Sequence, residues 1–207
     1  MRLPYMPPSP PPSSDSSATA AYTQLSARRS PKSLLQLDLT LLHSPPVASG
    51  WSSFLGSIRN QTSLPADIRE LCICRVAVLN GAVYEWEHHL PILREAGVGE
   101  RAVEEVESRK AWRGWKAEDA DAAAEAEDTQ HDDYGGLSEK QRAALAYTDA
   151  MTIGVKVSDE IFAELKKRFD ERAVVEITAA VAAYNCVSRF LVALDVGEMG
   201  EKKKEEQ

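Results

Sequence analysis

The sequence predicts an all-α protein. Apolar residues recur at intervals of three and four positions through most of the chain after residue 47, as on the buried faces of helices. Several of these stretches begin at a capping residue or end at a glycine. None of them alternates apolar and polar residues over the length of a strand or ends in a hairpin turn.

The composition divides the chain of 207 residues into a central domain and two ends. Residues 1–36 include a Pro/Ser-rich stretch and are expected to be largely disordered. Residues 197–207 are a charged tail. The helical domain is predicted over residues 37–196, with an acidic, flexible excursion at 116–136.

The helices expected in the first half of the domain follow one another closely. They cover residues 47–60, 65–80, 82–97 and 98–108. Pro65 suits the first turn of the second of these helices, and Asn80-Gly81 is a natural end for it. Pro91 lies inside the third helix and predicts a kink or a restart near Leu90.

Three more helices are expected in the second half, over residues 139–154, 159–169 and 172–194. Ser138 and Gln141 form a capping box at the start of the first. Ser158 is the expected N-cap of the second. Asp170 is in position to cap the last and longest helix.

Charge and cysteine content exclude several classes of protein. The formal charge of −8 argues against binding to a phosphate backbone, so no nucleic-acid partner is expected. No uninterrupted apolar run approaches the roughly 20 residues that span a bilayer, so no membrane partner is expected. The start of the sequence lacks the apolar core of a secretory signal. With three cysteines, this predicts a reducing, cytoplasmic location.

Polar groups occupy a helix stripe that should face the core. At about 100° per residue, Ala82, Glu85 and His89 fall on one narrow stripe, and the i, i+4 spacing lets Glu85 and His89 meet. Glu70 lies on a similar apolar stripe one helix earlier. Antiparallel packing of the two helices would bring Glu70 toward the other two groups, making a proton-transfer site. The alternative is structural: a Glu–His contact that stabilises the helix, and a Glu70 that pairs with an arginine.

The sequence does not favour a metal or a disulfide. His88 and His89 are adjacent and diverge on a helix, unlike the i, i+4 histidines of zinc proteases, so no metal site is predicted. Cys72 and Cys74 point to opposite sides of their helix and cannot readily form a bridge. Together with Cys186, they are interpreted as small buried apolar residues.

The stretch "LPADIRELCICRVAVLNGAVYEWEHH" resembles the carboxymuconolactone decarboxylase and alkylhydroperoxidase D-like superfamily. The resemblance extends from about Leu37 to Val196. It implies an all-helical bundle that forms homo-oligomers, with sites near the subunit interfaces.

In redox members of this superfamily, a glutamate on one helix precedes a Cys-x-x-Cys-x-x-x-His motif on the next. The glutamate corresponds to Glu70, the two cysteines to Ala82 and Glu85, and the histidine to His89. Thiol-based peroxide reduction needs a thiolate with a second thiol in reach. Neither position provides one here.

The resemblance therefore favours the decarboxylase members, which lack the cysteine pair and use no metal or organic cofactor. It implies decarboxylation or a related proton shift on a small carboxylated ring or lactone. His89 is the expected proton donor, Glu85 orients it or shuttles the proton, and Glu70 tunes the site or acts as a second acid. The residues expected to shape the substrate site are Tyr84, Trp86 and Ala82.

Two other functions remain open on the sequence. One is peroxide reduction through Cys72, Cys74 or Cys186. The other is a non-catalytic role, as an oligomeric scaffold or a binding protein for small acids, in which Glu85 and His89 only stabilise the fold.

Overall fold

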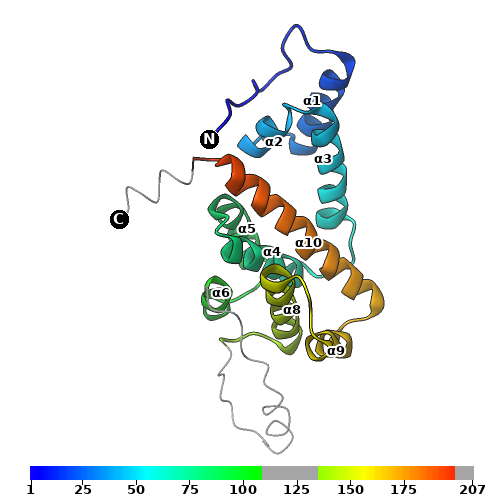
Figure 1. Ribbon diagram of the computed structural model, residues 1–207, viewed down its shortest axis with the longest axis vertical. Coiled ribbons are helices and arrows are strands. Elements are labelled where there is room, and N and C mark those ends of the chain that lie inside the picture. Colours follow the sequence, from blue (N-terminus) through cyan, green and yellow to red (C-terminus); the bar gives the residue numbers. More distant parts are fainter. Residues whose placement is uncertain (109–134, 199–207) are drawn as a thin grey trace, which may run out of the picture. The chain divides into compact units, whose positions relative to one another are not determined.

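The computed structural model describes residues 1–108 and 135–198 (Figure 1). Throughout these residues the regular structure is helical, which confirms the predicted all-α class. The helices are α1 (Ser16–Arg29), α2 (Gln36–Leu41), α3 (Pro45–Asn60), α4 (Ala66–Asn80), α5 (Val83–Glu95), α6 (Glu100–Glu107), α8 (Glu139–Asp149), the π-helix η1 (Ala150–Gly154), α9 (Asp159–Arg168) and α10 (Glu171–Leu194). Nearly all of the predicted excursion at 116–136 and of the tail at 197–207 lies outside the described residues.

The described residues form two compact units. The larger unit spans Ser63–Arg189, and α4 is its central helix. α4 packs against α5, α6 and α8, and α8 in turn packs against α9 (Figure 1). Every residue of α4 from Glu70 to Ala77 is buried, so this helix is apolar on nearly every side, as its sequence predicts.

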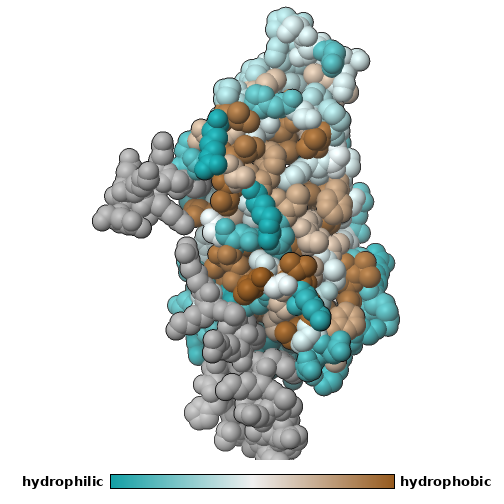
Figure 2. Space-filling view, in the orientation of Figure 1, coloured by the Kyte–Doolittle hydropathy of each residue, from teal (hydrophilic) through white to brown (hydrophobic). Residues whose placement is uncertain are grey.

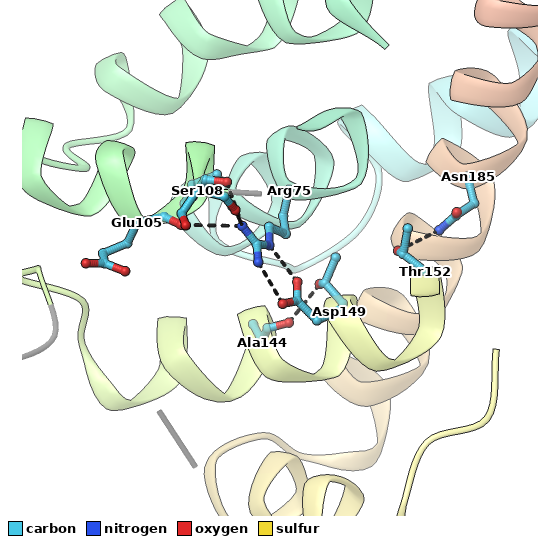
Figure 3. A network of polar contacts seen from close by, with 9 residues as sticks. Arg75, Glu105, Ser108, Ala144, Asp149, Thr152 and Asn185 are labelled. Atoms are coloured by element: carbon cyan, nitrogen blue, oxygen red, sulfur yellow. Dashed lines mark hydrogen bonds and ion pairs between the residues drawn. The ribbon is translucent and has the colours of Figure 1, made fainter. Parts of the chain in front are cut away.

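A buried ion pair joins α4 to the end of α8 (Figure 3). Arg75 donates hydrogen bonds from Nε and Nη2 to the two carboxylate oxygens of Asp149, at 2.6 and 2.7 Å. Its Nη1 donates to the carbonyl oxygens of Val106 and Ser108, at the C-terminal end of α6. The guanidinium therefore neutralises a buried carboxylate and also satisfies carbonyls that α6 leaves without helical partners.

The turn between α4 and α5 depends on Gly81. Its φ of 66° places it in the left-handed region, where a residue with a Cβ is disfavoured. α5 begins two residues later and runs through Pro91 to Glu95 as one helix, so the restart considered near Leu90 does not occur, and the alternative of a kink stays a prediction. Proline has no N–H, so the carbonyl of Glu87, four positions before Pro91, lacks its helical donor. Both residues are exposed, so water can replace that donor.

The smaller unit comprises Met1–Thr62 and the residues from Phe190 onward. It contains a well-formed helix, α1, within the segment that was expected to be largely disordered. Asp15 caps this helix by accepting from the backbone N–H of Ala18 at 2.7 Å. Tyr22 and Leu25 are buried in a small apolar core against α3. The free energy gained by burying an apolar helix face offsets the conformational entropy that otherwise keeps a Pro/Ser-rich chain disordered.

Ion pairs also hold α1 in place. Arg28 and Arg29, in its last turn, both pair with Asp38 of α2, whose side chain is almost fully buried. The composition of residues 1–36 gives no indication of this, because the partner carboxylate comes from beyond the segment.

α10 is long and apolar enough, by length and composition alone, to cross a bilayer; of the described residues, no other helix meets that test. The sequence was expected to contain no apolar run near 20 residues, whereas α10 meets a test based on the mean hydropathy of an 18-residue window. Here 44% of the window is buried within the protein, and the core helix of a soluble bundle passes the same test. On the face drawn in Figure 2, hydrophobic patches lie among hydrophilic residues. Ile153, Val155 and Val175 are among the exposed apolar residues.

Candidate active site

The turn at Gly81 brings Glu70 of α4 and His89 of α5 together. The ring nitrogen Nδ1 of His89 donates to Oε2 of Glu70 at 2.7 Å. The contact joins positions 19 residues apart. It was expected from antiparallel packing of the two helices, and the structure forms it within the larger unit.

Glu70 is held on both of its oxygens. Its second oxygen, Oε1, accepts from Nε of Arg69 at 3.0 Å. Burial favours the neutral acid, but the hydrogen bonds and positive charge of His89, followed by those of Arg69, outweigh it and hold the pKa of Glu70 below its usual value. Glu70 is therefore an ionised carboxylate in the core, shared between two basic side chains.

His89 is fixed by Glu70 and by an aromatic ring. Tyr184 of α10 meets the imidazole edge to face, with 5.1 Å between the ring centroids. The Glu70 contact places the proton of a neutral imidazole on Nδ1, which leaves Nε2 on the far side of the ring. The His89 side chain keeps 12% of its surface exposed, whereas Glu70 is nearly fully covered. Nε2 is thus the ring nitrogen that Glu70 does not engage.

Glu85 is buried and contacts α10. Oγ of Ser188 lies 3.1 Å from each carboxyl oxygen of Glu85. Burial raises the pKa of Glu85 well above its usual value, and the Ser188 hydroxyl offsets this effect only in part. A protonated Glu85 can exchange hydrogen bonds with this hydroxyl in both directions, as the equal distances allow.

The structure thus gives Glu85 and His89 different hydrogen-bond partners, although the i, i+4 spacing allowed them to meet. Glu85 bonds to Ser188 and forms no hydrogen bond with His89 among the described contacts. The contact that orients the imidazole comes from Glu70 instead. α10, which carries Ser188, provides the partner of Glu85.

The other predicted site residues belong to the start of α5. Ala82 and Tyr84 are buried and Trp86 is half-buried. Tyr84 stacks on the ring of His88 at 4.2 Å, and Nδ1 of His88 donates to the Tyr84 carbonyl oxygen. His88 is exposed and turned away from the Glu70–His89 pair. The substrate-shaping roles of Tyr84, Trp86 and Ala82 remain predictions.

The three cysteines differ in environment. Cys72 and Cys74 are buried, and burial raises the pKa of Cys72 to about 12 and that of Cys74 still further. The carboxylates of Glu70 and Glu85 add to the shift at Cys74. Cys186 is exposed, so its interpretation as a buried apolar residue was wrong: it lies on the outer side of α10. In the described part of the chain, no three His, Cys, Asp or Glu side chains are placed to share a metal ion.

Sequence reasoning missed the groups that complete the site. Arg69 and Ser188 received no role, and Tyr184 was left ambiguous. Arg69 precedes Glu70 directly, which is a usable signal in retrospect. Tyr184 and Ser188 come from a helix about 100 residues away, and no local pattern connects them to Glu85 and His89.

Comparison with known proteins adds the family. The model of the carboxymuconolactone decarboxylase family matches residues 45–128, which include Glu70, Ala82, Glu85 and His89. A search of curated proteins finds no match.

Several solved structures share the fold at low sequence identity. The debrominase Bmp8 without ligand aligns with a TM-score of 0.62 at 19% identity, over 87% of this chain and 85% of that one. A cysteine-to-alanine variant of Bmp8 in complex with 2,3,4-tribromopyrrole gives 0.58 at 22% identity, over 77% and 74%. A protein of unknown function from Agrobacterium tumefaciens, provisionally assigned to antioxidant defence as AhpD, gives 0.57 at 21% identity, over 74% and 90%. The chain thus matches the carboxymuconolactone decarboxylase family model over residues 45–128 and shares its all-helical fold with these structures.

Proposed function

We propose that this protein is a cofactor-free enzyme that transfers protons to or from carbon in a small carboxylated ring or lactone, with decarboxylation as its reaction. The observation that carries the proposal is the bond of 2.7 Å between His89 and the buried carboxylate of Glu70. The two positions that carry thiols in redox relatives hold Ala82 and Glu85 instead. Acid–base chemistry is what the remaining groups support.

The mechanism assigns the proton to Nε2 of His89. When the bond to the carboxylate carbon breaks, CO₂ leaves and the bonding electrons move into the adjacent carbonyl, giving an enolate. His89, as imidazolium, returns a proton from Nε2 to carbon and is reprotonated by solvent. Glu70 keeps Nδ1 protonated, fixes the ring orientation and offsets the positive charge of the imidazolium.

Glu85 contributes through its neutral form in this proposal. A second ionised carboxylate beside Glu70 would repel an anionic substrate and the enolate formed from it. A neutral acid bonded to Ser188 adds no such repulsion. It also holds a proton close to the site, in line with the shuttle role expected for Glu85.

Peroxide reduction is the less supported alternative. Its nucleophile must be a thiolate, and the raised pKa values of Cys72 and Cys74 keep both thiols protonated near neutral pH. Cys186 is exposed but has no second cysteine in the described residues that is also exposed. A purely structural role for Glu70 and His89 is the other alternative, and the experiment below separates it. Assembly into a homo-oligomer and a cytoplasmic location belong to the proposal as well.

The test is CO₂ release from a panel of carboxylated lactones and β-keto acids. His89→Gln should lower the rate by about 10²–10⁴-fold, the usual contribution of a general acid. His88→Gln is the matched control, because His88 is the exposed neighbour and should leave the rate unchanged. A variant with serine in place of all three cysteines should retain activity.

Two outcomes would contradict the proposal. Wild-type protein that releases no CO₂ from any member of the panel would favour a scaffold or binding role. Peroxide reduction that disappears in the cysteine-free variant would favour the redox alternative.

A further inference from the structure

We propose that Arg69 binds a carboxylate of the substrate and holds it beside Nε2 of His89. This inference rests on the proposed function and adds a binding residue to the same site. Arg69 contacts Glu70 through Nε alone. Among the described residues, its terminal nitrogens Nη1 and Nη2 form no other hydrogen bond, and 16% of its side chain stays exposed.

One carboxylate organises both basic groups. Oε1 of Glu70 accepts from Arg69 at 3.0 Å, and Oε2 accepts from His89 at 2.7 Å. Each side chain therefore directs its inner nitrogen at Glu70 and keeps its outer nitrogens for another group. Glu70 itself is almost fully covered, whereas both of its partners retain exposed surface.

The charge balance of this cluster favours an anion. The negative charge of Glu70 is matched by Arg69, and protonation of His89 makes the cluster positive. The chain as a whole has a formal charge of −8, so a partly exposed cluster with positive charge differs from the rest of the protein. The planar guanidinium is suited to a carboxylate, which accepts two parallel N–H bonds from it.

The reaction limits which carboxylate Arg69 can bind usefully. During decarboxylation the negative charge leaves the departing carboxylate, and a guanidinium on that group would stabilise the substrate more than the transition state. Arg69 therefore suits a carboxylate that remains through the reaction. Such a contact fixes the substrate's orientation and lowers KM more than it changes kcat.

The test measures anion binding without turnover. Benzoate is titrated into wild-type protein at constant ionic strength while the imidazole signal of His89 is followed by NMR, with assignment from His89→Gln. Benzamide, of the same shape but uncharged, is the comparison ligand. We expect benzoate to shift the His89 signal in a saturable way and benzamide to leave it unchanged.

Arg69→Gln should weaken benzoate binding by about tenfold or more, the value of a charge-assisted bond. Arg94→Gln is the matched control, because Arg94 is an exposed arginine on α5 and should bind benzoate as wild type does. Arg69→Lys keeps the charge without the planar fork and should bind with intermediate affinity. If Arg69→Gln fails to fold, the binding of benzoate is compared with that of benzamide, on wild type and on Arg69→Lys. This comparison then decides whether Arg69 binds the carboxylate.

Equal binding of benzoate and benzamide, or benzoate binding that survives Arg69→Gln, would overturn the inference. Benzoate binding that depends on Arg69, in a protein that releases no CO₂ from any substrate, would support the carboxylate site and contradict the proposed reaction. The two proposals can therefore fail separately.

Discussion

Replacing Asp149 by asparagine tests the packing that holds α4, and with it Glu70, in place. The side chains of Arg75 and Asp149 are 1% and 6% exposed and share two short bonds. The substitution leaves the guanidinium buried without its counter-charge. Removing one partner of a buried pair costs about 3–5 kcal/mol. The amide oxygen of asparagine and the α6 carbonyls still accept from Arg75, so we expect a loss near the lower value, about 3 kcal/mol.

The assay is urea unfolding followed by far-UV circular dichroism. With a slope of about 1–3 kcal/mol per molar urea, the midpoint should fall by roughly 1–3 M while the slope stays unchanged. Glu100→Gln is the matched control, because it breaks a surface pair with Arg94 and should leave the midpoint where it is. A midpoint for Asp149→Asn that coincides with the control would refute the reasoning. A double variant with Arg75→Met and Asp149→Leu should recover part of the loss, because no buried charge is left unpaired.

Two further predictions concern Glu85 and the thiols. Burial raises the pKa of Glu85, so the folded state binds its proton more tightly than the unfolded state does. The free energy of unfolding of the wild type therefore falls as pH rises above the ordinary value of 4.5 toward the folded value. Glu85→Gln should abolish this loss and be more stable than wild type at neutral pH. The measurement is the urea midpoint of each protein from pH 4 to 8. Parallel plots of midpoint against pH for the two proteins would contradict the raised pKa of Glu85. A thiol reagent should modify Cys186 rapidly in the native protein and Cys72 and Cys74 only on unfolding, followed by mass spectrometry; rapid native labelling of Cys74 would contradict its burial.

Local signals in the sequence predicted most helix boundaries of the larger unit. The capping box at Ser138 and Gln141 forms, Ser158 accepts from the N–H of Ile161, and Asp170 accepts from that of Ala173. Each depends on residues three positions apart, which a sequence displays directly. Gly81 ends α4 for the same reason, since the left-handed conformation it adopts is a local requirement.

Long-range partners explain what the sequence did not predict. The π-helix at the end of α8 was expected as ordinary helix. No local pattern connects Arg75 to Asp149, 74 residues away. α1 is ordered through Asp38, and Glu85 is directed to Ser188 across 103 positions. In each case a distant charge or hydroxyl decides the outcome, and spacing within one segment carries no information about it.

The pairing of Glu85 with Ser188 shows what a carboxyl group in the core requires. A buried carboxyl needs a hydrogen-bond partner, since an unsatisfied polar group in the core costs about 1–3 kcal/mol. Ser188 is that partner, and the burial that makes it necessary also keeps Glu85 neutral. Glu70, on the preceding helix, remains ionised because His89 and Arg69 supply it with positive charge. Two buried acids with opposite protonation states are the arrangement that divides donor and acceptor roles in acid–base sites, and here the division follows from the partner that each carboxyl meets.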